Sequence, residues 1–174
     1  MRRRLRIVHV GPDALADVVA LHRRCSAYTL WSRYHRAMGD PETYLGTLLG
    51  RPGALHLAVR VPHSGLVAIG HVMPDGDRAE VALLVQDGWQ NQGLGTRLLR
   101  RLACESRRLG WAELYGLVLP GERRISAMLR HGDVAADHVT EHGVTTVQVA
   151  TSGLGTVCGT RCADAIRAFG AVRR

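Results

Sequence analysis

Hydrophobic and polar positions along the chain predict alternating strands and helices. Residues 5–10 alternate and are rich in β-branched side chains, which is typical of a strand. Apolar residues then recur at helical spacing over residues 14–25. Residues 28–38 predict a second, less regular helix, and Asp40 followed by Pro41 predicts the start of a third.

The middle of the chain predicts a strand meander that leads into a long helix. Three strands are predicted over residues 55–61, 66–73 and 79–85, and turns rich in Pro, Gly and Asp separate them. Residues 93–109 have leucines on one side and arginines on the other, which predicts an amphipathic helix. A further strand is predicted over residues 111–119.

The last third of the chain completes a mixed α/β pattern. A short helix is predicted over residues 121–131, and strands are predicted over 134–140 and 144–150. A linker of small residues begins at Gly153, and residues 162–169 predict a terminal helix. Three meandering strands followed by a β-α-β unit predict a mixed sheet with helices on both faces.

The length of 174 residues fits one domain. We expect this domain to span residues 1–151 and to be followed by a C-terminal extension over residues 152–174. The extension could bind a partner, pair in a dimer or form a loose tail. Both a monomer and a homodimer remain open.

The sequence contains 23 arginines and no lysine, and its net charge is +8. Such a charge favours an anionic partner, which could be a nucleic acid or a polyanionic cofactor. The arginines form no long run, and no homeodomain, zinc-finger or RNA-recognition pattern accompanies them. An arginine-rich nucleic-acid binder is therefore kept only as a rival hypothesis, which a steep salt dependence of binding would support.

Neither a metal site nor a membrane segment is expected. Cys158 and Cys162 form one pair without a second pair at zinc spacing. His138 and His142 are four residues apart, but they fall in a predicted strand or turn. No apolar run approaches the roughly 20 residues that cross a bilayer, and no signal peptide is read. The expected location is the cytoplasm, with no membrane partner.

The stretch over residues 79–99 carries the strongest chemical signal. A strand leads through a glycine-containing turn into a helix, whose first backbone N–H groups lack intrahelical partners. These groups and the helix dipole attract anions, and Gly93 and Gly95 allow a phosphate to approach the backbone. The same letters over residues 153–155 precede no convincing helix, and we assign them no function.

The segment Gln90-x-x-Gly93-x-Gly95 resembles the Q/R-x-x-G-x-G/A signature of GNAT acetyltransferases. Its flanking strand and helix look like the fourth strand and third helix of that family, and the element order is similar over residues 5–150. A Rossmann site would need G-x-G-x-x-G after the first strand, which is missing. The resemblance implies the GNAT fold, an α/β (α+β) architecture. Its mixed, mostly antiparallel sheet has six to seven strands and helices on both faces.

The resemblance also implies acetyl-CoA as cosubstrate, without a metal. Backbone amides over residues 92–96 would hold the coenzyme A pyrophosphate, and residues 83–85 would offer main-chain groups to the pantetheine arm. In the family the fourth and fifth strands splay apart to admit this arm, and the fifth strand would be residues 113–117. Arg97 or Arg101 could help to bind the phosphates of the cofactor, although a position on the solvated surface of the helix would explain either arginine. The cofactor-binding residues expected are Leu83, Leu84, Val85, Gln90, Asn91, Gln92, Gly93, Leu94, Gly95 and Thr96.

Direct acetyl transfer requires a base that removes a proton from the ammonium form of the acceptor. Glu80 lies on the strand beside the expected cofactor, where many GNAT proteins carry such a base; the alternative is a strand-edge glutamate exposed to water. The leaving thiolate usually receives a proton from a tyrosine on the family's fourth helix. Residues 122–131 contain no tyrosine, so Ser126, acting directly or through water, and Tyr115 are the candidates.

Residues 32–36, Ser-Arg-Tyr-His-Arg, resemble the S-R-Y-x-R segment of bacterial GNAT domains related to protein lysine acetyltransferases. Ala37 and Met38 replace the two phenylalanines that usually follow. The resemblance places Trp31, Tyr34 and His35 near the acceptor, whereas the alternative is a packing segment with exposed arginines.

The sequence therefore predicts an N-acetyltransferase that transfers acetyl from acetyl-CoA to a primary amine, either a small molecule or a protein lysine. Because the tyrosine is missing, the alternative is a non-catalytic acyl-CoA-binding regulatory module.

Overall fold

The computed structural model describes residues 5–37, 39–119, 122–131 and 135–154. The expected helix over residues 162–169 and the pair Cys158 and Cys162 lie outside the described residues, as does most of the extension.

A seven-stranded sheet forms the centre of the molecule, with the order β1-β2-β3-β4-β5-β7-β6. Neighbouring strands run antiparallel except β4 and β5, which run parallel. The predicted mixed, mostly antiparallel sheet is therefore confirmed. The strands are β1 Arg6–His9, β2 Leu55–Val61, β3 Gly65–Asp75, β4 Arg78–Val85, β5 Glu113–Val118, β6 Asp137–Glu141 and β7 Val144–Ala150.

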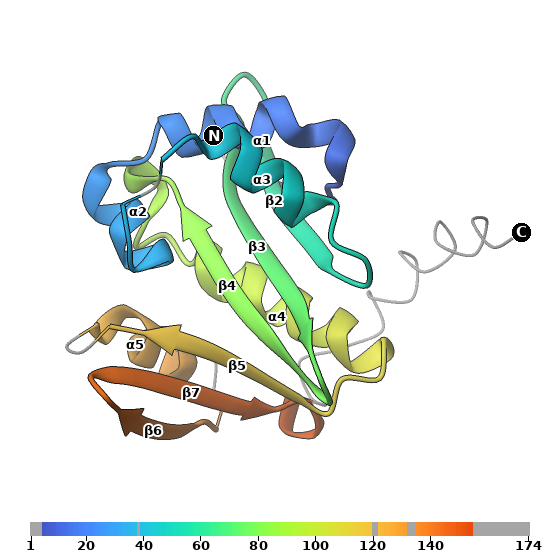
Figure 1. Cartoon of the computed structure of the whole chain (residues 1–174), viewed down its shortest axis with the longest axis vertical. Coiled ribbons are helices and arrows are strands. Elements are labelled where there is room, and N and C mark those ends of the chain that lie inside the picture. The colour runs from blue at the N-terminus through green and yellow to red at the C-terminus, as the bar shows by residue number, and fades with distance from the viewer. Residues whose placement is uncertain (1–4, 38, 120–121, 132–134, 155–174) are drawn as a thin grey trace, which may run out of the picture.

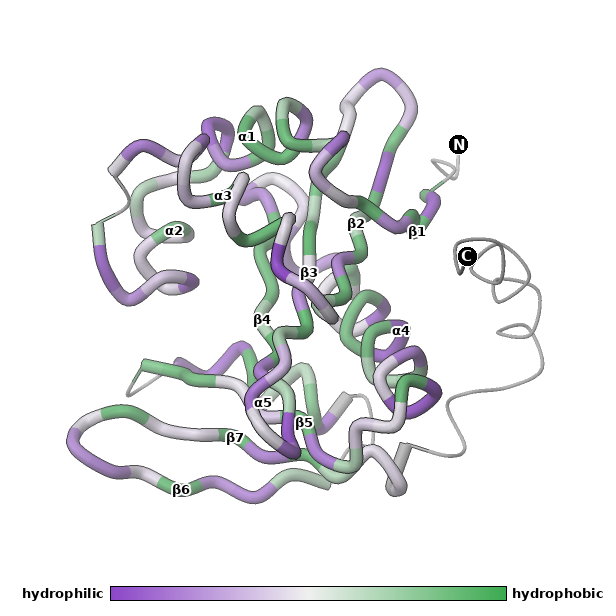
Figure 2. Tube along the Cα trace, turned by 45° about the vertical axis from the view of Figure 1, so that its right-hand side comes forward, coloured by the Kyte–Doolittle hydropathy of each residue, from purple (hydrophilic) through white to green (hydrophobic). Residues whose placement is uncertain are grey.

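Helices cover both faces of this sheet, as expected. Helices α1 and α3 lie on one face and α4 lies on the other, which Figures 1 and 2 show from two directions. The helices are α1 Leu15–Arg23, α2 Ala27–Tyr34, α3 Pro41–Leu49, α4 Leu94–Arg108 and α5 Arg123–His131. Short 3₁₀ turns are η1 Pro12–Ala14, η2 Asp87–Trp89 and η3 Thr151–Leu154.

Side-chain caps explain where two of the helices begin. The hydroxyl of Ser26 accepts a hydrogen bond from the amide of Thr29 at the start of α2. The carboxylate of Asp40 accepts from the amides of Glu42 and Thr43, and Pro41 occupies the first position of α3. Such caps satisfy amides that have no partner inside the helix.

The sheet separates two apolar clusters. Leu98 and Leu102 of α4 belong to the first cluster, and Leu21 of α1 with Leu45 of α3 belong to the second. All four side chains are buried. Gly70 of β3 lets α4 pack closely, because a Cβ there would lie 2.5 Å from a methyl of Leu102. This packing fixes the start of α4 beside the end of β4.

Some element boundaries differ from the sequence pattern. Strands β2 and β7 match the predicted ranges, but β3 continues two residues beyond 73, because Pro74 and Asp75 pair with Ala79 and Arg78. Among the described residues, no helix is long and apolar enough to cross a membrane.

Candidate functional site

The parallel strands β4 and β5 pair only at their beginnings. Ala79 lies opposite Leu114 and Glu80 opposite Tyr115, and beyond these pairs the two strands diverge (Figure 1). Gly116 follows at the point of divergence, where a Cβ would lie 3.2 Å from the carbonyl oxygen of Val81. A side chain at this position would press against β4, so glycine keeps the opening clear.

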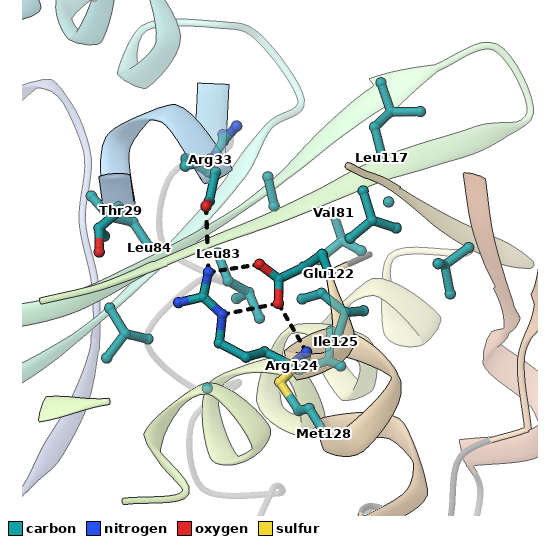
Figure 3. A pocket seen from close by; sticks show the side chains of 18 of the residues that line it. Thr29, Arg33, Val81, Leu83, Leu84, Leu117, Glu122, Arg124, Ile125 and Met128 are labelled. Atoms are coloured by element: carbon teal, nitrogen blue, oxygen red, sulfur yellow. Dashed lines mark hydrogen bonds and ion pairs between the residues drawn. The ribbon is translucent and has the colours of Figure 1, made fainter. Parts of the chain in front are cut away.

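A cavity of about 670 Å³ lies at this opening. Its walls come from β4 and β5, the start of α4, helix α5, helix α2 and Tyr44 of α3. Figure 3 shows Leu83 and Val81 from β4 facing Ile125 and Met128 from α5 across this space. A volume of this size is typical of small-molecule sites.

The first turn of α4 presents unpaired amides at one end of the cavity. Gly93 adopts a left-handed conformation with φ of 74°, and α4 begins at Leu94. The amide of Arg97 donates to the carbonyl of Gly93 at 3.1 Å. Within the part of the chain that the structure describes, the amides of residues 92–96 have no acceptor. Because the helix dipole adds positive potential there, this end of the cavity suits an anion.

Gly95 allows α5 to approach this turn. A Cβ at Gly95 would lie 3.3 Å from the sulfur of Met128 and 3.9 Å from a methyl of Val85. The second glycine of the predicted motif therefore keeps the cavity narrow where α4, α5 and β4 meet.

The side chain of Gln90 joins three elements. Its amide nitrogen donates to Val85 O and to the hydroxyl of Thr29, both at 3.0 Å. Its carbonyl oxygen accepts from Arg124 at 3.1 Å. Gln90 thus holds the turn against the end of β4 and against α2.

Asp87 of η2 reinforces the same junction. Its carboxylate accepts from the amide and hydroxyl of Ser26, at 2.8 and 2.6 Å, and from the hydroxyl of Thr29 at 2.8 Å. Burial opposes ionisation, but these hydrogen bonds prevail and lower the pKa of Asp87 to about 2. The N-terminus of α2 is therefore anchored to the segment that precedes the amide-rich turn.

Glu122 and Arg124 form an ion pair inside the cavity (Figure 3), with 2.6 Å between their closest atoms. Arg124 also donates to the hydroxyl of Ser32 at 3.3 Å, so it connects α5 with α2. The hydrogen bond from Arg124 lowers the pKa of Glu122, and its partner Glu122 raises the pKa of Arg124. Sequence analysis did not single out Arg124, because nothing local predicts contacts so distant in the chain.

Several solved structures share this architecture. The GNAT domain of S. lividans PAT is 19% identical with a TM-score of 0.71, covering 84% of this chain and 90% of that chain. Spermidine N-acetyltransferase from Vibrio cholerae in complex with CoA and spermine is 12% identical with a TM-score of 0.68, covering 86% and 97%. The ribosomal-protein-S18-alanine N-acetyltransferase from Escherichia coli is 16% identical with a TM-score of 0.64, covering 85% and 94%.

The chain has the GNAT fold. No protein-family model matches the sequence, and no curated protein matches it either. The expectation of a GNAT architecture, which came from residues 90–95 and the element order, is confirmed at the level of the fold.

On this GNAT fold, nine of the ten residues expected at the cofactor line the cavity. Gln92 is the exception, since it is exposed and its side chain donates to Gly88 O at 3.0 Å. Arg97 is exposed and Arg101 pairs with Glu105, and neither arginine lines the cavity. The positions of these two arginines therefore do not support the suggested contact with the phosphates of the cofactor.

The expected acid–base groups lie in different places. Glu80 lines the cavity from β4, at the last pair before the strands diverge. Ser126 is not among the lining residues, although its neighbours Ile125 and Ala127 are. Tyr115 also lies outside the lining, and its hydroxyl donates to Asp75 at 2.6 Å. Burial and Asp75 raise the pKa of Tyr115 to about 12.

The segment expected at the acceptor lies mostly in the cavity wall. Tyr34 and His35 line the cavity, whereas Trp31 is 50% exposed and lies outside the lining. The hydroxyl of Tyr34 lies 2.6 Å from Nε2 of His22, and burial raises the pKa of Tyr34 to about 12. Arg33, Arg36 and Tyr44 also line the cavity, and sequence analysis assigned them no role.

Proposed function

We propose that this protein is an acetyl-CoA-dependent N-acetyltransferase. The observation that carries the proposal is the row of unpaired amides at residues 92–96, of which residues 93–96 line the cavity between the diverging strands. This arrangement offers an anion site for a diphosphate and, next to it, a slot for an extended chain. The V. cholerae spermidine N-acetyltransferase has the same fold and was solved with CoA and spermine, which supports this reading.

In this proposal, the amides of residues 92–96 bind the pyrophosphate of acetyl-CoA, and the pantetheine arm lies along residues 83–85. The exposed backbone of β4 pairs with the amides of the arm as a neighbouring strand would, since β5 has moved away. The thioester is then directed towards Glu80, which lines the same cavity.

Glu80 acts in this mechanism as the general base. It takes a proton from the acceptor ammonium, and the neutral nitrogen attacks the thioester carbonyl. The new C–N bond forms as the C–S bond breaks, and the coenzyme A thiolate leaves with a proton. Since α5 offers no tyrosine, Ser126 stays the predicted donor, and its position outside the lining requires an intervening water.

The cofactor site is tested by placing a negative charge beside the amides. Gly93→Asp should weaken acetyl-CoA binding about tenfold in calorimetry, because the new carboxylate repels the pyrophosphate. Gly65→Asp is the matched control, since Gly65 has φ of 70° and open space like Gly93 but begins strand β3, opposite Val61 of β2. Equal binding by both variants would contradict the proposed cofactor site.

A second candidate function is a non-catalytic acyl-CoA-binding module. The observation in its favour is that α5 has no tyrosine and that Ser126 does not line the cavity. Calorimetric binding of acetyl-CoA without release of free thiol across a broad amine panel would select this function. Thiol release with any amine would exclude it.

A further inference from the structure

The cavity wall formed by α2, the segment that follows it and α3 carries an excess of positive charge. The charged Arg and Glu side chains that line the whole cavity are Arg33, Arg36, Arg124, Glu80 and Glu122. Arg124 and Glu122 neutralise each other in their ion pair. Two guanidinium groups, from Arg33 and Arg36, therefore share the cavity with one remaining carboxylate, that of Glu80.

Aromatic rings hold these two arginines. The guanidinium of Arg33 lies 4.6 Å from the ring centre of Tyr34, and that of Arg36 lies 5.2 Å from the ring centre of Tyr44. The two rings pack edge to face, with 5.5 Å between their centres. A cation–π contact orients a guanidinium but leaves its charge and its N–H fork available to a ligand.

Among the described residues, no carboxylate forms an ion pair with Arg33 or Arg36. Behind the wall, burial lowers the pKa of His22 and His71, and the charge of Arg33 lowers both further. The lowered pKa values of His22 and His71 are thus consistent with a positive charge on Arg33 that no ion pair among the described residues neutralises.

We propose that the acceptor is an amine that also carries an acidic group, a carboxylate or a phosphate, bound by Arg33 and Arg36. This inference rests on the proposed acetyltransferase function. The guanidinium fork binds either group through paired hydrogen bonds. The amine then lies towards Glu80, so that the acceptor's opposite charges match those of the wall. A polyamine would instead place cations beside two guanidinium groups.

The test compares amines of similar basicity that differ in the second group. Release of free thiol from acetyl-CoA is measured with hexylamine, 6-aminohexanoate and 1,5-diaminopentane, and with propylamine and 3-aminopropylphosphonate. We expect kcat/KM to be at least about tenfold higher for an acid-bearing amine than for its matched amine and for the diamine. Comparing the preference for 6-aminohexanoate with that for 3-aminopropylphosphonate shows whether the site binds a carboxylate or a phosphonate better.

Arginine variants test whether the preference comes from this wall. Arg36→Met at the exposed rim and Arg33→Met behind it should each reduce the preference for the acid-bearing amine about tenfold or more, mainly through a higher KM. Their affinity for acetyl-CoA should match that of the wild type. Arg6→Met on the exposed part of β1 is the control and should keep the preference.

The outcomes separate this inference from the proposed function. Turnover of hexylamine or the diamine at an equal or higher kcat/KM overturns the acidic acceptor but leaves an acetyltransferase. Loss of acetyl-CoA affinity in Arg33→Met and Arg36→Met also overturns it, because the arginines would then serve the cofactor. Failure of the wild type to bind acetyl-CoA overturns the proposed function itself.

Discussion

Glu122 and Glu80 line the same cavity, but their different surroundings give the two carboxylates different chemical properties. Glu122 accepts hydrogen bonds from Arg124, which lowers its pKa and makes it a poor proton acceptor. Glu80 takes part in none of the ion pairs found among the described residues, and it lies where β4 and β5 separate. Of the two, Glu80 is therefore the one that we propose as the general base.

We expect Glu80→Gln to lower kcat about 100-fold, because general base catalysis contributes on this order and an amide cannot accept the proton. Affinity for acetyl-CoA should change little, since the amide is nearly isosteric with the carboxylate. Thiol release and calorimetry measure the two effects. Glu141→Gln on the exposed strand β6 is the control. Unchanged kcat in Glu80→Gln would remove Glu80 from the mechanism.

At the scale of elements, α2 is docked by side-chain hydrogen bonds at both ends of the cavity wall. Asp87 holds its N-terminus, and Arg124 donates to Ser32 near its C-terminus. Helix α2 is only eight residues long, and Thr29 is its one buried residue. A helix this short depends on such contacts rather than on its own propensity.

Asp87→Asn should therefore loosen α2 and lower the free energy of unfolding. We expect a loss of about 1 kcal/mol, a modest value because Asp87 is exposed and solvent screens its charge. The folded-state pKa of about 2 lies below the unfolded value of about 3.9. Hence the contribution is complete above about pH 4 and is lost as the pH falls towards 2. Urea unfolding of both proteins at pH 7 and pH 3 measures it.

The control for this prediction is Asp137→Asn on the exposed strand β6. If Asp87→Asn and Asp137→Asn had the same stability at pH 7, the carboxylate of Asp87 would not anchor α2.

At the scale of the whole molecule, the sheet face under α1 and α3 buries three histidines. His71 is fully buried, and its Nδ1 lies 2.9 Å from Nδ1 of His56. Nδ1 of His22 lies 2.7 Å from the carbonyl oxygen of Val18. Burial lowers the pKa of all three side chains. A core that contains imidazoles in place of aliphatic side chains makes stability depend on pH.

The protein should lose stability between pH 7 and pH 5. Unfolded histidines bind protons below about pH 6.5, whereas burial lowers the pKa of these imidazoles in the folded protein, so the folded state binds fewer protons and acid favours unfolding. Each such histidine contributes a slope of up to about 1.4 kcal/mol per pH unit in this range. Denaturant unfolding at several pH values measures the slope. The double variant His56→Leu, His71→Met should show a smaller dependence of the unfolding free energy on pH. An unchanged slope would contradict the explanation that buried histidines cause it.

The pattern of apolar residues predicted most of the elements, because each strand or helix must direct one side towards a core. Residues 55–61 and 144–150 form strands over the predicted ranges. The amphipathic residues 93–109 form α4 within one residue at each end. The predicted ends of an element were less accurate where pairing with another strand decides them. Strand β3, for example, continues to Asp75, which pairs with Arg78 of β4.

The sequence by itself determined the elements, their order and the glycine turn before α4, because these depend on residues adjacent in the chain. Only the tertiary structure decided which side chains share the cavity. It placed Arg124 beside Ser32, 92 residues away, brought Arg33, Arg36 and Tyr44 into one wall, and left Trp31 outside the lining. Such contacts follow from the register of the sheet and the docking of helices across it, and local periodicity contains no information about either.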